Sequence, residues 1–276
     1  MKRLVLAMIA LSGAMACLAQ DSTGKDKADT IRVGGMIIIK SGKDDDGNKK
    51  DRNITISNRH KRKSSNVSTN WWIVDLGFAN VKDQTNYSAA QSGGFVSSGV
   101  GKDQLNLRTG KSVNVNIWLF MQKLNMIKHA VNLKYGLGLE LNNYRFEDEK
   151  IRFTKNPTTI NIDPTLDGAD KNKLAADYVT VPLMLNFNFT PGREKGFGFS
   201  AGVSAGYLYD ARQKIKNNGD KKKLHDDFDL EKWKLSYVGE LNLGPVRLYG
   251  SLAMKNMWQK GLDQTPYNVG IRFSHW

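Results

Sequence analysis

The stretch from Tyr178 to Phe189 reads YVTVPLMLNFNF and places an apolar residue at every odd position, with mostly polar residues between them. Strict alternation over this length is the period of a β-strand, so the segment is predicted to be a strand with one apolar face. That face ends in two phenylalanines and suits hydrocarbon as well as a protein core. What decides between the two is whether the pattern repeats without any helix to cover it.

The pattern does repeat, and no segment between the repeats reads as a helix long enough to cover the apolar faces. An even number of such strands with bare apolar faces is typical of barrels in the bacterial outer membrane. The sequence therefore predicts an all-β fold, an eight-stranded antiparallel up-and-down transmembrane β-barrel. The other seven segments are residues 72–78, 113–119, 131–141, 197–209, 233–243, 246–254 and 267–273.

The connections between these strands alternate in length. Long polar ones are expected near residues 81–110, 146–175, 212–228 and 255–266, and tight ones near 123–128, 190–195 and 244–245. Outer-membrane barrels carry long loops outside the cell and short turns in the periplasm. Both chain ends are therefore expected on the periplasmic side.

Composition excludes two other classes of protein. A mean hydropathy of −0.48 and the lack of any internal apolar run of about 18 residues exclude a helical membrane protein. The net charge of +14 could suggest a nucleic-acid partner, but no recognition-helix pattern, RNA-binding signature or zinc spacing accompanies it. No nucleic acid is expected.

The first 70 residues are expected to lie outside the barrel, which would span 71–276. Residues 1–19 have a charged start, an apolar core and small residues before Gln20, as in a secretory signal peptide. Lipidation of Cys17 is the alternative to simple cleavage after Ala19. A polar periplasmic segment follows at 20–70, in which residues 31–39 and 53–57 could pair as a short hairpin.

A basic run lies near the end of this segment. It is either a solvated linker or a contact with anionic headgroups at the membrane surface, where each such charge is worth about 1 kcal/mol. Its cations are Arg59, Lys61, Arg62 and Lys63.

Charged residues recur on the polar faces of the strands. If the apolar faces meet lipid, these charges point into a lumen that eight strands make just wide enough for side chains to fill. Buried charges must be paired, so a salt-bridged plug is expected, with an ion or proton path as the alternative. The set is Asp75, Lys134, Glu140, Lys234, Glu240, Arg247 and Arg272.

Tyrosines and tryptophans often lie near the expected strand ends. This placement is typical of the aromatic girdles at the two membrane interfaces, although ordinary strand composition also explains it. The residues concerned are Trp72, Tyr135, Tyr144, Tyr207, Tyr209, Trp233, Trp258, Tyr267 and Trp276.

No constellation of residues indicates catalysis. The histidines are isolated, and His225 beside Asp226 and Asp227 lies in a charged loop where a solvated surface is the simplest interpretation. The chain has no serine-hydrolase, zinc-protease, phosphate-loop or paired-cysteine motif. No enzymatic activity, cofactor or metal is expected.

Residues 173–185, KLAADYVTVPLML, resemble the Tyr-x-x-Ile/Val-Pro-Leu-x-Leu signature of the porin-like outer-membrane β-barrel domain family of Gram-negative bacteria, which includes PorT-type proteins. The resemblance covers roughly residues 71–276 and implies outer-membrane insertion and an eight-stranded barrel, without catalytic residues. Residues 269–273, VGIRF, also resemble the final-strand signal of the barrel-assembly machinery. Phe273 and Trp276 would carry that signal, although Trp276 is out of phase with Phe273.

Three functions from different classes follow. The first is a structural or binding role, in which the long loops contact ligands or partners outside the cell and the closed barrel, expected to be a monomer, serves as their rigid scaffold. The second, implied by the resemblance, is a PorT-like part of a protein secretion or assembly complex. The third is a small porin-like channel, which the inward charges disfavour. Outer-membrane lipid is an expected partner, and Lys221, Lys222 and Lys223 are candidate contacts to the phosphates of lipopolysaccharide.

Overall fold

The computed structural model describes residues 29–33, 36–40, 65–191 and 196–274. The chain divides into two units, residues 1–63 and 64–276. The signal peptide and Cys17 lie outside the described residues, as do the basic cations Arg59 to Lys63 and the terminal Trp276.

The described part of the first unit is one hairpin. Strand β1 (Asp29–Val33) pairs antiparallel with β2 (Met36–Lys40), and Val33 lies opposite Met36. The run at 31–39, expected to be a single strand pairing with 53–57, is therefore divided between two strands. The dipeptide between them, Gly34-Gly35, is of the kind that suits two-residue hairpin connections.

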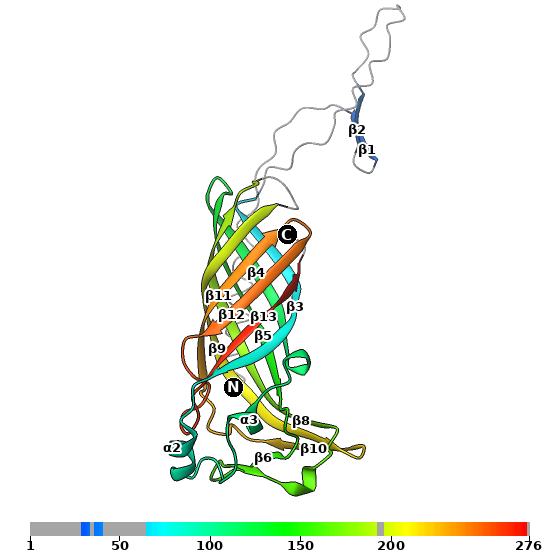
Figure 1. Ribbon diagram of the computed structural model, residues 1–276. Helices are drawn as coiled ribbons and strands as arrows, with labels where there is room; N and C mark the ends of the chain where they lie inside the picture. The colour runs from blue at the N-terminus through cyan, green and yellow to red at the C-terminus, as the bar shows by residue number, and fades with distance from the viewer. Residues whose placement is uncertain (1–28, 34–35, 41–64, 192–195, 275–276) are drawn as a thin grey trace, which may run out of the picture. The chain divides into compact units, whose positions relative to one another are not determined.

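The second unit contains a closed ring of eight antiparallel strands, as predicted (Figure 1). Each strand pairs with its neighbours in chain order, and the last strand pairs with the first to close the ring. Closure leaves no unpaired edge in the wall, which is what hydrocarbon requires of a β-structure. The strands are β3 (Val67–Asp83), β4 (Val113–Ile127), β5 (Val131–Arg145), β8 (Lys171–Asn188), β9 (Phe197–Asn217), β11 (Trp233–Leu243), β12 (Val246–Ala253) and β13 (Gln264–Phe273).

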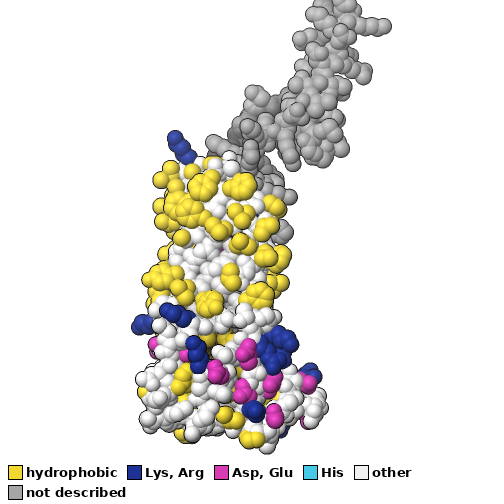
Figure 2. All heavy atoms as spheres, viewed as in Figure 1, with side chains coloured by type: hydrophobic (Ala, Val, Ile, Leu, Met, Phe, Trp, Pro, Cys, Tyr) yellow, Lys and Arg dark blue, Asp and Glu magenta, His cyan; other side chains and the backbone are white. Residues whose placement is uncertain are grey.

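The alternation in β8 sorts its side chains as the sequence predicted. Val181 and Leu183 are about half exposed on the outside of the wall. Met184, the residue after Leu183, is buried inside. Every large exposed hydrophobic residue of the described chain lies in a barrel strand or next to the end of one. Figure 2 shows these apolar side chains over the barrel wall. The wall is therefore the surface that meets lipid.

Two irregularities adjust the wall. Trp72 has a positive φ of 55°, and the pairing of β3 with β4 skips it, so that both Trp71 and Trp72 face outward while Ile73 returns to the inside. The pairing passes over Leu119 of β4 at the same point, so the register between β3 and β4 is unchanged, and the β-bulge lies instead in β4 against β5, between Trp118 and Phe120. In β8, Pro182 lacks a backbone donor, and the ladder to β5 is interrupted there.

The long connections all lie at one end of the barrel and fold together into a cap. They contain short elements: α2 (Tyr87–Ser92), α3 (Lys102–Leu105), two 3₁₀ turns at Thr109–Lys111 and Pro164–Leu166, and the strands β6 (Ile151–Phe153), β7 (Ile160–Ile162) and β10 (Asp220–His225). Among the described residues, no helix is long and apolar enough to span a membrane.

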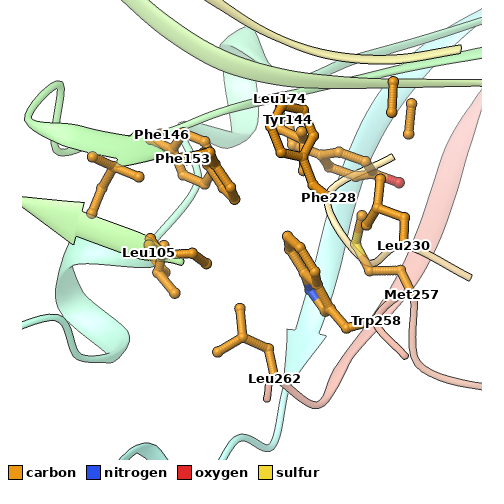
Figure 3. Close-up of a cluster of buried hydrophobic side chains, with 14 of the residues drawn as sticks. Leu105, Tyr144, Phe146, Phe153, Leu174, Phe228, Leu230, Met257, Trp258 and Leu262 are labelled. Atoms are coloured by element: carbon orange, nitrogen blue, oxygen red, sulfur yellow. The ribbon is translucent and has the colours of Figure 1, made fainter. Parts of the chain in front are cut away.

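The cap has an apolar core of its own, drawn in Figure 3. Phe153 is fully buried at its centre, with ring centroids 5.4 Å from Phe228, 5.8 Å from Phe146 and 6.0 Å from Trp258. From their sequence these connections were expected only to be long and polar. Tyr144 and Trp258, expected in the aromatic girdles, are buried in this core instead.

Candidate functional site

Six of the predicted lumen charges form two groups of ion pairs, one of four residues and one of two. Arg272 binds Asp75 through two hydrogen bonds, Nε to Oδ1 and Nη2 to Oδ2, both of 2.6 Å, and its remaining nitrogen reaches Glu240. Lys134 also pairs with Glu240, and Lys234 pairs with Glu140. All six side chains are buried. Three cations therefore meet three carboxylates, so the network is neutral.

Arg247 does not join this network. It is half-buried on β12 and donates a hydrogen bond to the hydroxyl of Ser274, beyond the end of β13. The pattern of the sequence correctly predicted that Arg247 lies on the inner face. Its position at the start of β12, however, lies at the tight-turn end of the barrel. Six of the seven predicted lumen charges therefore form buried ion pairs with one another, and Arg247 does not.

Asparagines and aromatic side chains surround the ion pairs, and sequence reasoning missed them. Asp75 Oδ2 accepts hydrogen bonds from Trp118 Nε1 at 2.8 Å and Asn116 Nδ2 at 3.1 Å. Asn142 and Asn268 each donate to Glu140 at 3.1 Å. The alternation of asparagine with valine and isoleucine in residues 113–117 was the signal for them. The asparagine amides donate hydrogen bonds to lone pairs of the carboxylates that the cations do not use.

Two cations also lie over aromatic rings. The guanidinium of Arg272 is 5.5 Å from the ring centroid of Trp118, and Lys234 Nζ is 5.4 Å from that of Tyr178. Such contacts stabilise a cation that has left water. Tyr178 itself belongs to the cap core, so the apolar cap lies directly against the charged layer.

Little space remains inside the barrel. A cavity lined by Asn116, Glu140, Thr180 and Arg272 has a volume of about 30 Å³. That volume holds about two or three water molecules, at about 10–15 Å³ for each. The arrangement of charges and asparagines can hold the strands in register, and it leaves no room here for a solute.

The three candidate lysines Lys221, Lys222 and Lys223 are all exposed on β10. Because β10 pairs with β9, Lys221 lies opposite Lys216 and Lys223 lies opposite Lys214. Lys222 lies opposite Ile215 and projects to the other face of the sheet. The structure therefore separates one of the three from the other two.

An open hollow lies on the cap between α2, the β6–β7 turn and the β12–β13 connection. Its volume is about 550 Å³, and its lining combines the aromatic residues Phe95 and Trp258 with polar ones such as Thr158 and Asp263. Gly261 has a positive φ of 82°, and a Cβ there would lie 2.2 Å from the ring of Phe95. A glycine is therefore required for this wall of the hollow.

No cluster of side chains in the described residues is suited to hold a metal ion. His225 makes a hydrogen bond of 3.0 Å through Nδ1 to Asp210, on the outside of the sheet. Asp226 and Asp227, its neighbours in the sequence, instead cap local backbone amides.

The last strand presents its aromatic end to the outside. Phe273 is exposed and lies opposite Val74 on the first strand, in phase with Val269 and Ile271. It thus has the outward orientation that the expected assembly signal needs.

A comparison with protein families matches residues 72–255 to the family described as outer membrane protein beta-barrel domain. The chain belongs to this family. As a member of the outer membrane β-barrel family, it is located in the outer membrane, with the apolar wall in lipid. A comparison with curated proteins found no significant match.

Among solved structures, this protein is similar to Ail, the attachment invasion locus protein of Yersinia pestis. The two are 11% identical, and the match covers 74% of this chain and 98% of that chain, with a TM-score of 0.30. A similarity this weak supports no conclusion about function.

Proposed function

We propose that this protein is a non-enzymatic outer-membrane barrel that acts as a structural or binding protein through its extracellular cap. The observation that carries the proposal is that four long connections share one apolar core, while the barrel beneath is filled by ion pairs. A rigid scaffold that holds a folded set of loops is a common arrangement for recognition.

The cap hollow is the proposed position of a ligand. Its volume of about 550 Å³ lies within the roughly 300–1,000 Å³ of small-molecule sites. Its wall includes the side chains of Lys260 and Asp263, which offer a donor and an acceptor beside the aromatic surface of Trp258. A small polar ligand, or a polar side chain of a partner protein, would suit this lining.

Site-specific photo-crosslinking in intact cells tests this role. A photoreactive residue placed at Thr158, in the hollow, should capture a defined partner or ligand from outside the cell. The control position is Leu183, on the lipid-facing wall, which should capture only lipid. Failure of Thr158 to capture anything above this control would count against a binding role of the cap.

A PorT-like role in a secretion or assembly complex is a second proposal, and it rests on the signature at residues 173–185. The signature residues also have roles in the barrel itself that need no partner protein. Tyr178 is buried where the lumen meets the cap, and Leu183 faces lipid. Co-purification from native membranes separates the two roles, since a secretion component should retain stoichiometric partners in mild detergent. A third proposal, a small solute channel, requires a lumen more open than the one described.

A further inference from the structure

Strands β8 and β9 continue beyond the lipid-facing wall. A bulge between Asp177 and Tyr178 marks the change, and residues 171–177 of β8 and 210–217 of β9 lie on the cap side of it. Together with β10 these residues form a three-stranded sheet, here called the sheet extension. Figure 1 shows it running obliquely away from the barrel at the cap end.

The inner face of the sheet extension packs against the cap. Asn172 donates a hydrogen bond of 2.9 Å to the carbonyl of Glu149, and Gln213 donates one of 2.9 Å to the carbonyl of Ile151. Leu174, the direct register partner of Gln213 on this face, is buried in the cap core. The outer face is therefore the one that continues the lipid-facing side of the wall.

Cations are arranged in cross-strand rows on this outer face. Direct register partners lie side by side on the same face, so each row brings like charges together. One row runs Arg145, Lys173, Lys214, Lys223, and the next runs Lys171, Lys216, Lys221. Like charges directly opposite each other are destabilising in a sheet. Such an arrangement needs an anion from elsewhere to balance it.

The carboxylates nearby balance only part of this charge. Lys216 pairs with Asp170 at 3.1 Å, and Arg212 pairs with Asp177 and Asp210. In the described part of the chain, no ion pair is formed by Lys171, Lys173, Lys214, Lys221 or Lys223.

The crowding of cations also affects the pKa of two of these lysines. Burial, followed by the charges of Lys171 and Lys214, lowers the pKa of Lys173 to about 8. Burial and the charge of Arg212 lower the pKa of Lys214 as well. In both cases burial is the larger cause, and the neighbouring cations act in the same direction.

A short ion-paired zone separates this face from the lipid-facing surface. Along β8 the outward positions run from Lys171 and Lys173 through buried Ala175 and Asp177 to exposed Val179, and Asp177 pairs with Arg212. Next to this zone the rings of Tyr207 on β9 and Trp233 on β11 meet at 5.0 Å. Aromatic side chains of this kind lie at headgroup level in membrane barrels. The cationic rows therefore lie just beyond this zone, on the cap side of the end of the apolar wall.

We propose that the outer face of the sheet extension binds the phosphate groups of an anionic lipid of the outer leaflet, with the phosphorylated lipid A part of lipopolysaccharide as the occupant. The basis is uncompensated charge in two rows, placed next to the end of the lipid-facing wall. The proposal requires only that the barrel is in the outer membrane, so it does not depend on what the cap binds.

The test compares two faces of one strand. In the variant Lys221→Gln/Lys223→Gln two cations leave the outer face, whereas the control Lys222→Gln/Lys102→Gln removes the same charge from the opposite face of β10 and from α3 on the cap. Binding of bisphosphorylated lipid A, phosphate-free lipid A and inorganic pyrophosphate to the full-length protein in detergent is measured by native mass spectrometry. Resistance of the unheated barrel to SDS confirms that each variant is folded.

The outer-face variant should bind bisphosphorylated lipid A about 25-fold more weakly, about fivefold for each lysine, and the control should bind it as the unchanged protein does. Added salt should reduce the difference, and phosphate-free lipid A should bind all variants equally weakly. Equal binding by the outer-face variant, or an equal loss in the control, would overturn the proposal. Pyrophosphate binding as tight as that of lipid A would overturn the assignment to a lipid.

Discussion

Arg272 and Asp75 are direct cross-strand partners on the last and first strands of the barrel, joined by two hydrogen bonds of 2.6 Å. The pair therefore stands at the seam where the chain closes on itself. Asp75 is fully buried and Arg272 nearly so, which places the interaction away from solvent screening.

Removing both partners of this pair should cost less than the two single changes added together. Asp75→Asn leaves a buried guanidinium with one carboxylate fewer, and we expect a loss of about 3–5 kcal/mol in the free energy of unfolding. Asp75→Asn combined with Arg272→Met should lose less than the sum of the single changes, with a coupling of about 1–3 kcal/mol. Urea unfolding of the refolded barrel, followed by tryptophan fluorescence, measures both; strictly additive losses would contradict the pairing.

A second prediction concerns the close packing of the inner wall. A Cβ on Gly138 of β5 would lie 2.7 Å from the carbonyl oxygen of Ile117 and 2.7 Å from Cε3 of Trp118. Gly138→Ala should therefore destabilise the barrel by about 1–3 kcal/mol through overpacking. The control is Gly250→Ala, whose Cβ meets nothing closer than 3.6 Å and should change stability by at most about 1 kcal/mol. Equal effects in the same unfolding experiment would refute this packing.

A third prediction separates the cap from the barrel. Phe153 contacts three aromatic rings at the centre of the cap core, so Phe153→Ala should destabilise the cap by about 3–5 kcal/mol. We expect proteases to cleave the connections of the variant from outside while the barrel remains resistant to SDS. Phe78→Ala, on the exposed outer wall, is the matched control and should leave the cap intact. A protease-resistant cap in the Phe153 variant would show that the core is not cooperative.

The fourth prediction is a pH dependence. Because burial and neighbouring cations lower the pKa of Lys173 to about 8 in the folded protein, the unfolded chain binds more protons between about pH 8 and pH 10.5. The stability of the protein should therefore rise with pH across that window, and Lys173→Gln should remove this contribution.

Amine-reactive labelling as a function of pH, quantified by mass spectrometry, measures the pKa of Lys173 directly. It should lie near 8 in the folded protein, move upward in Lys214→Gln, and approach about 10.4 in the unfolded chain. If Lys173 had the same titration curve in the folded and unfolded protein, its burial among cations on the sheet extension would be contradicted.

The barrel could be predicted from sequence because lipid outside and a packed lumen inside impose strict alternation on every strand. The alternation at Tyr178–Phe189 survives even the interruption at Pro182, since one missing donor does not change which side a residue faces. The same reasoning placed Asp75, Lys134 and Arg272 on the inner face. It could not show that Arg247 lies too near the rim to meet a carboxylate.

The cap and the sheet extension lay beyond such reasoning for a physical reason. Phe153 and Phe228 each have a single apolar neighbour at the next alternate position, Ile151 and Leu230, and runs this short carry too little period for a shared core to be inferred. Lys221, Lys222 and Lys223 look equivalent in the sequence. Only the register of β10 on β9 separates Lys222 from the other two.

The measurement that bears most directly on the filled lumen is the conductance of the purified, full-length protein in a planar lipid bilayer. Ion pairs across the barrel and a cavity of only about 30 Å³ predict that the inserted protein carries no steady current. Stable, ohmic current steps from correctly folded protein would contradict the account and favour a channel instead.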